Sequence, residues 1–578
     1  MMTENDRMWL AGGVLVGGSM VLSASTWAGA AVGAVLAEAD APPLSPYTVF
    51  EMTRDWHSVW PHSATASGIG AAFFDLAVVA GVVWGLWAAL RWFHNASHLA
   101  TLHQVRDLAP RRAARTATRL RASLRDVRAR DVAPRDRGVL LGDHLPTGVE
   151  LRGSDEDTYL ALMAPRAGKS STLAIPVAEG APASLLVTSN KPDVYAATLA
   201  ARRRAGNAWT FDTQGIAQVE RAWWWDIIAE AETLDRAERL ASHFIAQVKS
   251  DTADPFWAQG ASDLLVGMFR AAWWDGATVR DVLRWLADPK ERAPLRILYR
   301  YEEVLAEQVD SSINIAEETQ SGIYQNARTA VSALRDEKVL AWMLPDRNRP
   351  RFRPEEFALS RDSLYLLSKK SGAAAAIVAA LTDAVFTTAS EAGERHGGRL
   401  PEPMRAVLDE VANICPIADL PDLYSHLGSR GITALSIFQS YAQGVRAWGE
   451  AGMNALWGAS TKKIIGVGLD DPRFVNDIAT LVGNHEVTRG SYTRSRDGGS
   501  TSISEQREQI LEPAQIRAMK RGTALLLATG MPVAQIALRP WYEEQAMAHL
   551  GPAMKTEEAA IAKRANLAWE ERKAQRRG

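Results

Sequence analysis

Two short stretches of the chain carry residue types that could bind a nucleotide and assist its hydrolysis. The first is APRAGKSS, residues 164–171, where Gly168, Lys169 and Ser170 have the spacing that ends a G-x-x-x-x-G-K-[ST] phosphate loop. In such a loop the lysine reaches the β- and γ-phosphates, and the hydroxyl binds Mg²⁺. Met163 stands where the first glycine belongs, a departure that the loop tolerates if the backbone φ there is negative.

The second stretch supplies carboxylates. PMRAVLDEVANICPI, residues 403–417, reads as an apolar strand that ends in Asp409 and Glu410. A carboxylate at the end of a strand beside the phosphate loop holds Mg²⁺, usually through water, and the adjacent glutamate can polarise the attacking water. Gln439 ends the next apolar run and is placed to sense the γ-phosphate, or is an ordinary polar residue at a strand end.

A parallel sheet is needed to bring these stretches together. The segment from Asp157 to Pro176 reads as strand, turn and start of a helix, the context that a phosphate loop requires. Further apolar runs alternate with helical stretches, which favours a mainly parallel sheet with helices on both faces. These predicted strands are residues 183–189, 207–212, 362–368, 431–440, 462–469 and 522–530.

About 240 residues separate Lys169 from Asp409, too many for a minimal nucleotide-binding fold. Residues 230–345 show repeated amphipathic helical patterns and no clear strand pattern, which predicts an inserted all-α domain. The fold class that follows is α/β: a P-loop nucleotide-binding domain with an all-α insertion, preceded by two transmembrane helices.

The predicted membrane anchor occupies residues 1–95. Residues 8–37 and 69–93 are apolar runs long enough to cross a bilayer, joined by an extracytoplasmic loop over residues 38–68. Asp75 lies in the second run, where we expect an interfacial or helix–helix contact rather than a proton site. Between residues 91 and 137 there are 12 arginines against four aspartates, whereas the loop contains only Arg54. The positive-inside rule therefore places both termini in the cytoplasm.

Composition limits the remaining segments. The chain of 578 residues has 65 lysines and arginines against 67 acidic residues, so any nucleic-acid surface must be local. A single cysteine, Cys415, excludes an intramolecular disulfide framework and a multi-cysteine metal site. Residues 96–137 are predicted to form a basic stem near the membrane, in which the arginine-rich stretch 110–131 has helical spacing. Residues 551–578 are predicted to form a charged, helical C-terminal tail.

The order of these blocks resembles the type IV coupling proteins of bacterial conjugation and secretion, the TraG/TraD-like ATPases. The resemblance covers nearly the whole chain. It rests on the two N-terminal spans and on the segments APRAGKSS, VTSNKPDVYAATLAARR, FDTQG, ADPFWAQGASDLL, LDEVANICPI, LGSRGITALSIFQSYAQ and ILEPAQIRAMKRGTALLLATGMPV. It implies a RecA-like ring ATPase, a homohexamer in the bacterial cytoplasmic membrane with ATP and Mg²⁺ as cofactors. Its implied partners are single-stranded DNA with its relaxase and the components of a type IV secretion channel.

The resemblance also assigns residues to roles. It implies that Lys169, Asp409, Glu410 and Gln439 are catalytic, that Ser170 and Asp409 bind the metal, and that Arg430 is an arginine finger acting on a neighbouring subunit. Arg430 is the only arginine in GSRG and is offset by two positions from the family pattern. The predicted nucleotide-binding loop consists of Pro165, Arg166, Ala167, Gly168, Lys169, Ser170 and Ser171.

Two alternative functions stay open at this stage. One is a different ring translocase, either chromosome-segregating (FtsK-like) or protein-secreting, and the other is a membrane docking scaffold that binds a nucleotide without hydrolysing it. Residues 249–257 and 491–504 are candidate channel linings, although we expect the second to be a plain exposed hairpin loop. The predicted divisions of the cytoplasmic part are residues 138–229 and 346–550 for the nucleotide-binding domain, with the insertion at 230–345 between them.

Overall fold

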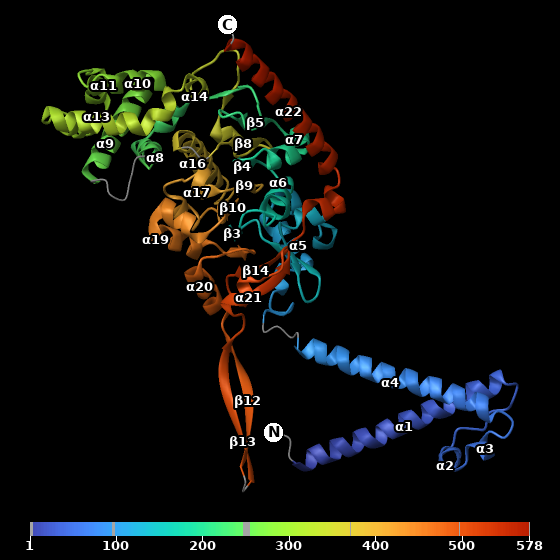
Figure 1. Cartoon of the computed structure of the whole chain (residues 1–578). Coiled ribbons are helices and arrows are strands. Elements are labelled where there is room, and N and C mark those ends of the chain that lie inside the picture. Colours follow the sequence, from blue (N-terminus) through green and yellow to red (C-terminus); the bar gives the residue numbers. More distant parts are fainter. Residues whose placement is uncertain (1–3, 95–98, 247–254, 370–371, 496–497, 577–578) are drawn as a thin grey trace. The chain divides into compact units, whose positions relative to one another are not determined.

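The computed structural model describes residues 4–94, 99–246, 255–369, 372–495 and 498–576, and the chain divides into two compact units, Met1–His98 and Leu99–Gly578. The first unit contains two long helices, α1 (Glu4–Leu36) and α4 (Ala64–His94), with the short helices α2 (Pro46–Arg54) and α3 (Trp56–Val59) between them (Figure 1). The long helices cover the two predicted spans. By length and composition, Ala64–Trp84 could cross a membrane, while the apolar stretch Met20–Leu36 is shorter.

Glycines allow the two long helices of the first unit to approach closely. A Cβ at Gly29 would collide with the backbone oxygen of Gly70, and a Cβ at Gly70 would collide with that of Gly29. Nearby, the Thr26 hydroxyl donates a hydrogen bond to Oδ2 of Asp75 at 2.8 Å. Asp75 thus makes a contact between helices, as predicted.

The second unit is built on an 11-stranded sheet with the order β2-β1-β15-β14-β11-β3-β10-β9-β4-β8-β5. The seven strands from β11 to β5 are parallel, and they include every predicted strand except the last one. The bounds of these seven are β3 (Tyr159–Leu162), β4 (Leu185–Ser189), β5 (Ala208–Phe211), β8 (Ser363–Leu367), β9 (Met404–Leu408), β10 (Ile432–Phe438) and β11 (Lys462–Ile465).

The other edge of the sheet differs from the expected parallel arrangement. Four strands pair antiparallel there: β14 (Thr523–Ala528) against β11, then β15 (Ala534–Ala537), β1 (Val139–His144) and β2 (Val149–Gly153). Of these, only β14 was predicted. The sheet is therefore mixed.

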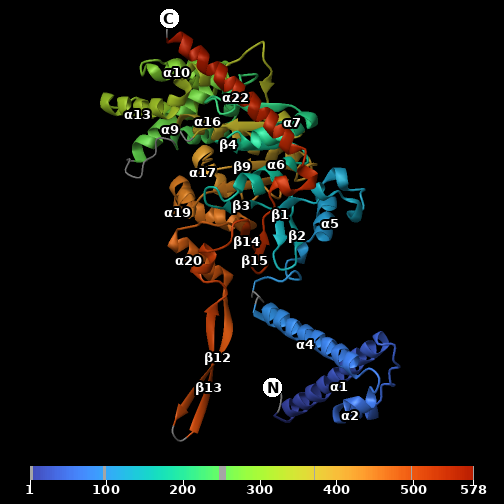
Figure 2. The same cartoon turned by 45° about the vertical axis from the view of Figure 1, so that its right-hand side comes forward.

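Helices cover both faces of this sheet (Figures 1 and 2). One face carries α6 (Ile175–Glu179), α7 (Asp193–Ala205) and the C-terminal helix α22 (Leu550–Gln575), which runs along α7. The other face carries α16 (Gly372–Arg395), α17 (Val411–Ile414) and α19 (Tyr441–Ala459). The predicted charged tail is thus a helix that docks on its own chain, where Arg564 donates to the carbonyl of Ala217.

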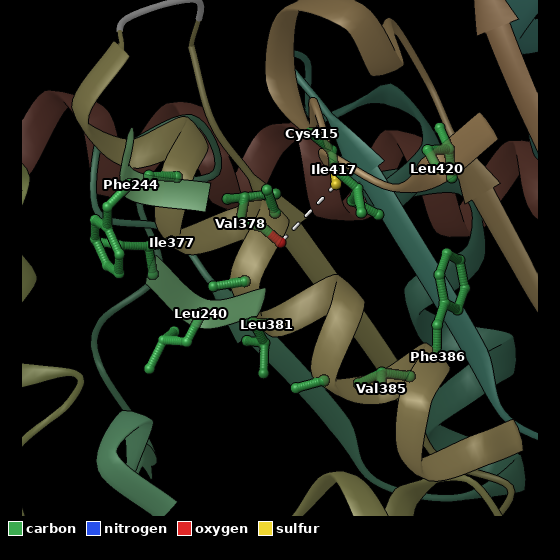
Figure 3. Packing of buried hydrophobic residues seen from close by; sticks show 14 of the residues in the cluster. Leu240, Phe244, Ile377, Val378, Leu381, Val385, Phe386, Cys415, Ile417 and Leu420 are labelled. Carbon is green, nitrogen blue, oxygen red and sulfur yellow. Dashed lines mark hydrogen bonds between the residues drawn. The ribbon is translucent and has the colours of Figure 1, made fainter. Parts of the chain in front are cut away.

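Helix α16 is a long apolar helix of the sheet unit. Figure 3 shows its side chains Ile377, Val378 and Leu381 packed with Leu240 and Phe244 of α8 (Leu234–Ile245). On another side, the thiol of Cys415 donates a long hydrogen bond of 3.9 Å to the carbonyl of Val378. The α16 segment Ala374–Arg395 is long and apolar enough to cross a membrane, but most of it is buried in the protein.

Between β5 and β8 the chain forms a group of helices (Figure 1). They run from α8 through α9 (Pro255–Asp275), α10 (Val279–Ala287), α11 (Ala293–Tyr301), α12 (Glu303–Ile313) and α13 (Glu317–Ala330) to α14 (Glu337–Ala341). A short parallel pair, β6 (Trp224–Trp225) with β7 (Arg351–Phe352), joins the two chain segments that flank the group. In the candidate lining segment 249–257, residues 249–254 lie outside the described residues.

The basic stem is helical over only part of its length. Helix α5 (Pro110–Leu120) is followed by short 3-10 turns instead of continuing to residue 131. The reason is tertiary: the buried Arg121 pairs with Asp136 at 3.0 Å and with Glu402 at 3.2 Å. The stem therefore packs against the sheet unit.

A long two-stranded hairpin follows α20 (Pro472–Val482). It pairs β12 (Asn484–Ser495) with β13 (Gly498–Gln509) in continuous antiparallel register and leads into α21 (Pro513–Arg517). The segment 491–504 is thus part of a hairpin, as expected, but it consists largely of paired strand rather than loop.

Candidate nucleotide site

The predicted phosphate loop lies between β3 and a helical turn. Residues 163–169 connect β3 to a π-helical turn, Ser170–Ala174, which continues into α6. Gly168 has φ +94° and Arg166 has φ +63°, so the loop reverses through two left-handed residues. The hydroxyls of Ser171 and Thr172 donate to the carbonyl of Gly168 at 3.0 and 2.9 Å, which fixes the turn. Helical structure therefore begins directly after the loop, and the free backbone N–H groups at a helix start favour an anion.

Met163 occupies the first position of this loop without backbone strain. Its φ is not in the left-handed region, and its N–H donates to the carbonyl of Phe438 at 3.1 Å. The side chain is fully buried and lies against Gly466, just after β11. Because the backbone at Met163 is not left-handed, a residue other than glycine fits at this position.

Asp409 follows β9 directly and is buried. Its N–H donates to the carbonyl of Thr188, and the hydroxyl of Ser189 donates to its Oδ2 at 3.4 Å. Burial raises the pKa of Asp409 to about 6, against the opposing attraction of the nearby Lys169. Burial likewise lowers the pKa of Lys169, against the attraction of Asp409 and Glu410. The mutual influence shows that the lysine and the two acids share one electrostatic environment.

Two buried atoms of this group have no hydrogen-bond partner within the described chain: Nζ of Lys169 and Oδ1 of Asp409. Buried polar groups in native proteins are almost always paired. An ammonium and a carboxylate oxygen left open beside a phosphate-type loop fit a magnesium-bound polyphosphate, because the phosphate would pair with the former and the metal with the latter.

Glu410 is held from two sides. Nε2 of Gln439 donates to its Oε1 at 2.6 Å, and Nδ2 of Asn190 donates to its Oε2 at 2.7 Å. The backbone of Glu410 is left-handed, with φ +50°, a conformation that non-glycine residues adopt only when their surroundings impose it. The ends of β9, β10 and β4 thus bring Glu410, Gln439 and Asn190 into direct contact.

Arg430 lies elsewhere. It precedes β10, whereas Gln439 follows the same strand, so the two residues stand at opposite edges of the sheet. The Arg430 guanidinium pairs with Glu394 at 2.7 Å and approaches the carbonyl of Gly398 at 3.5 Å. The structure brings Lys169, Asp409, Glu410 and Gln439 together and leaves Arg430 outside this group.

Two residues at the site were missed from the sequence. Asn190 contacts Glu410, and Arg521, just before β14, donates to the carbonyl of Arg166 in the phosphate loop. A signal for Asn190 was present, since the segment SNKPD follows a predicted strand and must lie at the same sheet edge as the loop. Arg521 had no such signal, because its strand is antiparallel to the neighbours of the loop.

Comparison with known proteins gives one match to a family model. Residues 403–521 match the family model described as the TraM recognition site of TraD and TraG. A comparison with curated protein sequences gave no match.

Solved structures of a bacterial conjugative coupling protein, TrwB, are similar in fold. The unbound form has a TM-score of 0.53 at 20% identity and covers 68% of this chain and 87% of that chain. The complex of TrwB with a non-hydrolysable ATP analogue has a TM-score of 0.52 at 20% identity, covering 67% and 86%. The complex with ADP and Mg²⁺ has a TM-score of 0.51 at 19% identity, covering 67% and 85%.

The family match contains Asp409, Glu410 and Gln439, and the solved structures agree with the α/β fold that carries them. Residues 403–521 are thus similar to the TraD and TraG family model, and the chain shares its fold with the coupling protein TrwB.

Proposed function

We propose that the chain is a membrane-anchored ring ATPase that acts as a type IV coupling protein. It recruits DNA with its attached relaxase and uses ATP hydrolysis to deliver the DNA to a conjugative secretion channel. The observation that carries this proposal is the convergence of Lys169, Asp409, Glu410 and Gln439 at the carboxyl ends of β3, β9 and β10. TrwB, which shares the fold, has been crystallised with nucleotides and with Mg²⁺.

Each residue has a chemical role in this proposal. The N–H groups of the loop over residues 165–171 and the ammonium of Lys169 bind the phosphates. Ser170 and Asp409 would hold Mg²⁺, which when bound neutralises charge that develops on the phosphates. Glu410 orients and polarises the attacking water, and Gln439 links that water to the γ-phosphate.

The anchor belongs to the same proposal. Helix α4 exposes apolar side chains such as Ile69, Phe73 and Leu76, which a bilayer would cover. With the arginine-rich segment after it, the positive-inside rule supports a two-pass protein of the bacterial cytoplasmic membrane, with both termini in the cytoplasm.

Assembly into a ring would complete the ATPase site. We propose a homohexamer in which Arg430 of one subunit reaches the nucleotide of the next, so that hydrolysis moves neighbouring subunits relative to each other. The family description of residues 403–521 as a TraM recognition site supports docking of a relaxosome partner on this segment.

The test measures ATP hydrolysis by the full-length protein in lipid nanodiscs, with and without single-stranded DNA. We expect DNA-stimulated turnover that Lys169→Ala reduces about 100-fold or more, while the exposed control Lys338→Ala keeps it. Wild-type turnover equal to that of Lys169→Ala would instead favour the non-hydrolysing scaffold. Stimulation by duplex DNA alone would favour a chromosome-type translocase.

A further inference from the structure

Asn190 makes a specific contact with the carboxylate that the proposed reaction needs. Strands β4 and β9 are parallel neighbours, with Thr188 in register with Leu408. Two residues further along each strand, Asn190 therefore comes level with Glu410. Its Nδ2 donates to Oε2 of Glu410 at 2.7 Å, while Gln439 occupies Oε1.

Among the described residues, Glu410 is the only one whose side chain forms a hydrogen bond with the amide of Asn190. Its Oδ1 is buried and has no partner among the described residues. The backbone beneath it is fixed, since the N–H of Lys191 donates to the hydroxyl of Ser189 at 3.2 Å. A rotated amide would turn its oxygen towards the carboxylate and repel it, so only the N–H group can face Glu410. The Asn190 amide therefore serves as a hydrogen-bond donor to the Glu410 carboxylate.

A general base must accept a hydrogen bond from the water that it activates. Here both oxygens of Glu410 already accept amide N–H groups, and such bonds to a charged acceptor are short and strong. In the proposed reaction, the Gln439 side chain leaves Glu410 and forms its hydrogen bond with the γ-phosphate instead. Asn190 has no second partner in the described structure and so would stay on Glu410.

We infer that Asn190 is a positioning residue that competes with the attacking water for Glu410 and so restrains ATP turnover. This inference rests on the proposed ATPase function. It assigns to the end of β4 a role in setting the basal rate, separate from the binding of the phosphates by the loop after β3.

The experiment compares steady-state ATP hydrolysis by full-length wild type, Asn190→Ala and Asn190→Leu in nanodiscs without DNA. Both variants remove the amide donor, and the leucine keeps the approximate size of the side chain without adding a charge beside Glu410. We expect kcat to rise roughly tenfold in both, as for loss of one hydrogen bond to a charged group, with KM for ATP unchanged. The control Asn476→Ala removes an exposed amide on α20 and should leave both constants unchanged.

A second comparison tests whether the effect passes through Glu410. In a Glu410→Gln background, adding Asn190→Ala should not change the residual rate, whereas a general loosening of the fold would change it. Melting temperatures of all variants report whether they fold.

The outcomes separate the two proposals. Wild-type turnover no faster than that of Lys169→Ala would refute the ATPase function itself. Wild-type turnover above that level, with folded Asn190 variants that are equal to wild type or slower, would overturn the restraint by Asn190 and leave the ATPase function standing.

Discussion

Met163 lies against Gly466 so closely that a Cβ added to Gly466 would come within 2.5 Å of the Met163 Cγ. The large residue at the start of the phosphate loop is thus accommodated by a residue without a side chain at the end of the neighbouring strand, β11. The loop has room for the large Met163 side chain because Gly466, about 300 residues later in the sequence, has no side chain at the point of contact.

We therefore predict that Gly466→Ala weakens nucleotide binding, because overpacking of about 1–3 kcal/mol would displace Met163 and the loop that follows it. Met163→Ala in the same chain should restore much of the affinity by removing the obstructing atoms. Titration with a fluorescent ATP analogue measures both effects. Gly458→Ala is the control, since a Cβ there meets nothing within 4 Å. Unchanged affinity in Gly466→Ala would show that the contact does not constrain the loop.

The position of Arg430 leads to a prediction about assembled rings. Arg430→Ala should lower kcat about 1000-fold, the order expected for an arginine finger, without changing ring size measured by mass photometry. Glu394→Gln, which removes only the ion-pair partner of Arg430, should keep turnover. Intact rings of Arg430→Ala with full ATP turnover would rule out the finger.

Glu230 gives a prediction about pH. Burial raises its pKa from 4.5 to about 7, against the hydrogen bond from the Trp225 indole and the attraction of Arg236. Between these two pH values the folded chain holds a proton that the unfolded chain releases, so the free energy of unfolding falls as pH rises through this window. The loss approaches about 3 kcal/mol above pH 7.

The check is thermal unfolding followed by tryptophan fluorescence at pH 5 and pH 8. Glu230→Gln has no proton to lose, so it should unfold at a higher temperature than wild type at pH 8, and the gain should shrink at pH 5. Glu238→Gln, at an exposed position of α8, should track wild type at both pH values. A gain of equal size at the two pH values would contradict the assignment to Glu230.

The hairpin of β12 and β13 pairs only with itself among the described strands. Replacing residues 488–505 by an Asn-Gly turn, which suits a tight hairpin, should therefore leave the melting temperature and the basal ATPase rate near those of wild type. Differential scanning fluorimetry and the ATPase assay measure this. A large fall in melting temperature would mean that the hairpin supports the sheet unit, whereas a selective loss of stimulation by single-stranded DNA would place it in the DNA path.

The parallel half of the sheet could be predicted because its strands are buried on both faces and read as continuous apolar runs. In a parallel sheet, carboxyl ends meet at one edge, and this alone brings Lys169, Asp409 and Gln439 together. Strands β1, β2 and β15 were missed because polar and apolar residues are mixed along them. Their pairing depends on distant contacts, such as the ion pair of Arg539 with Asp143.

The same limit explains the missed details of the site. Asn190 and Glu410 are 220 residues apart, and no local pattern links them. The stem was expected to continue as a helix past Leu120, but Arg121 finds its partners in Asp136 and Glu402, the second of which lies 281 residues away. Local periodicity describes an element, whereas its end is often set by a partner from another part of the chain.

Helix α16 has a consequence for biosynthesis. On the ribosome its segment Ala374–Arg395 presents the same signal as a genuine span, and only packing into the sheet unit hides it. The elements that contact it include α8, which precedes it in the chain, and α17 and β10, which follow it. The nascent protein therefore passes through a stage at which α16 is made but some of its packing partners are not. Under the proposed two-pass topology, the machinery that inserts the first two helices has to leave α16 outside the membrane.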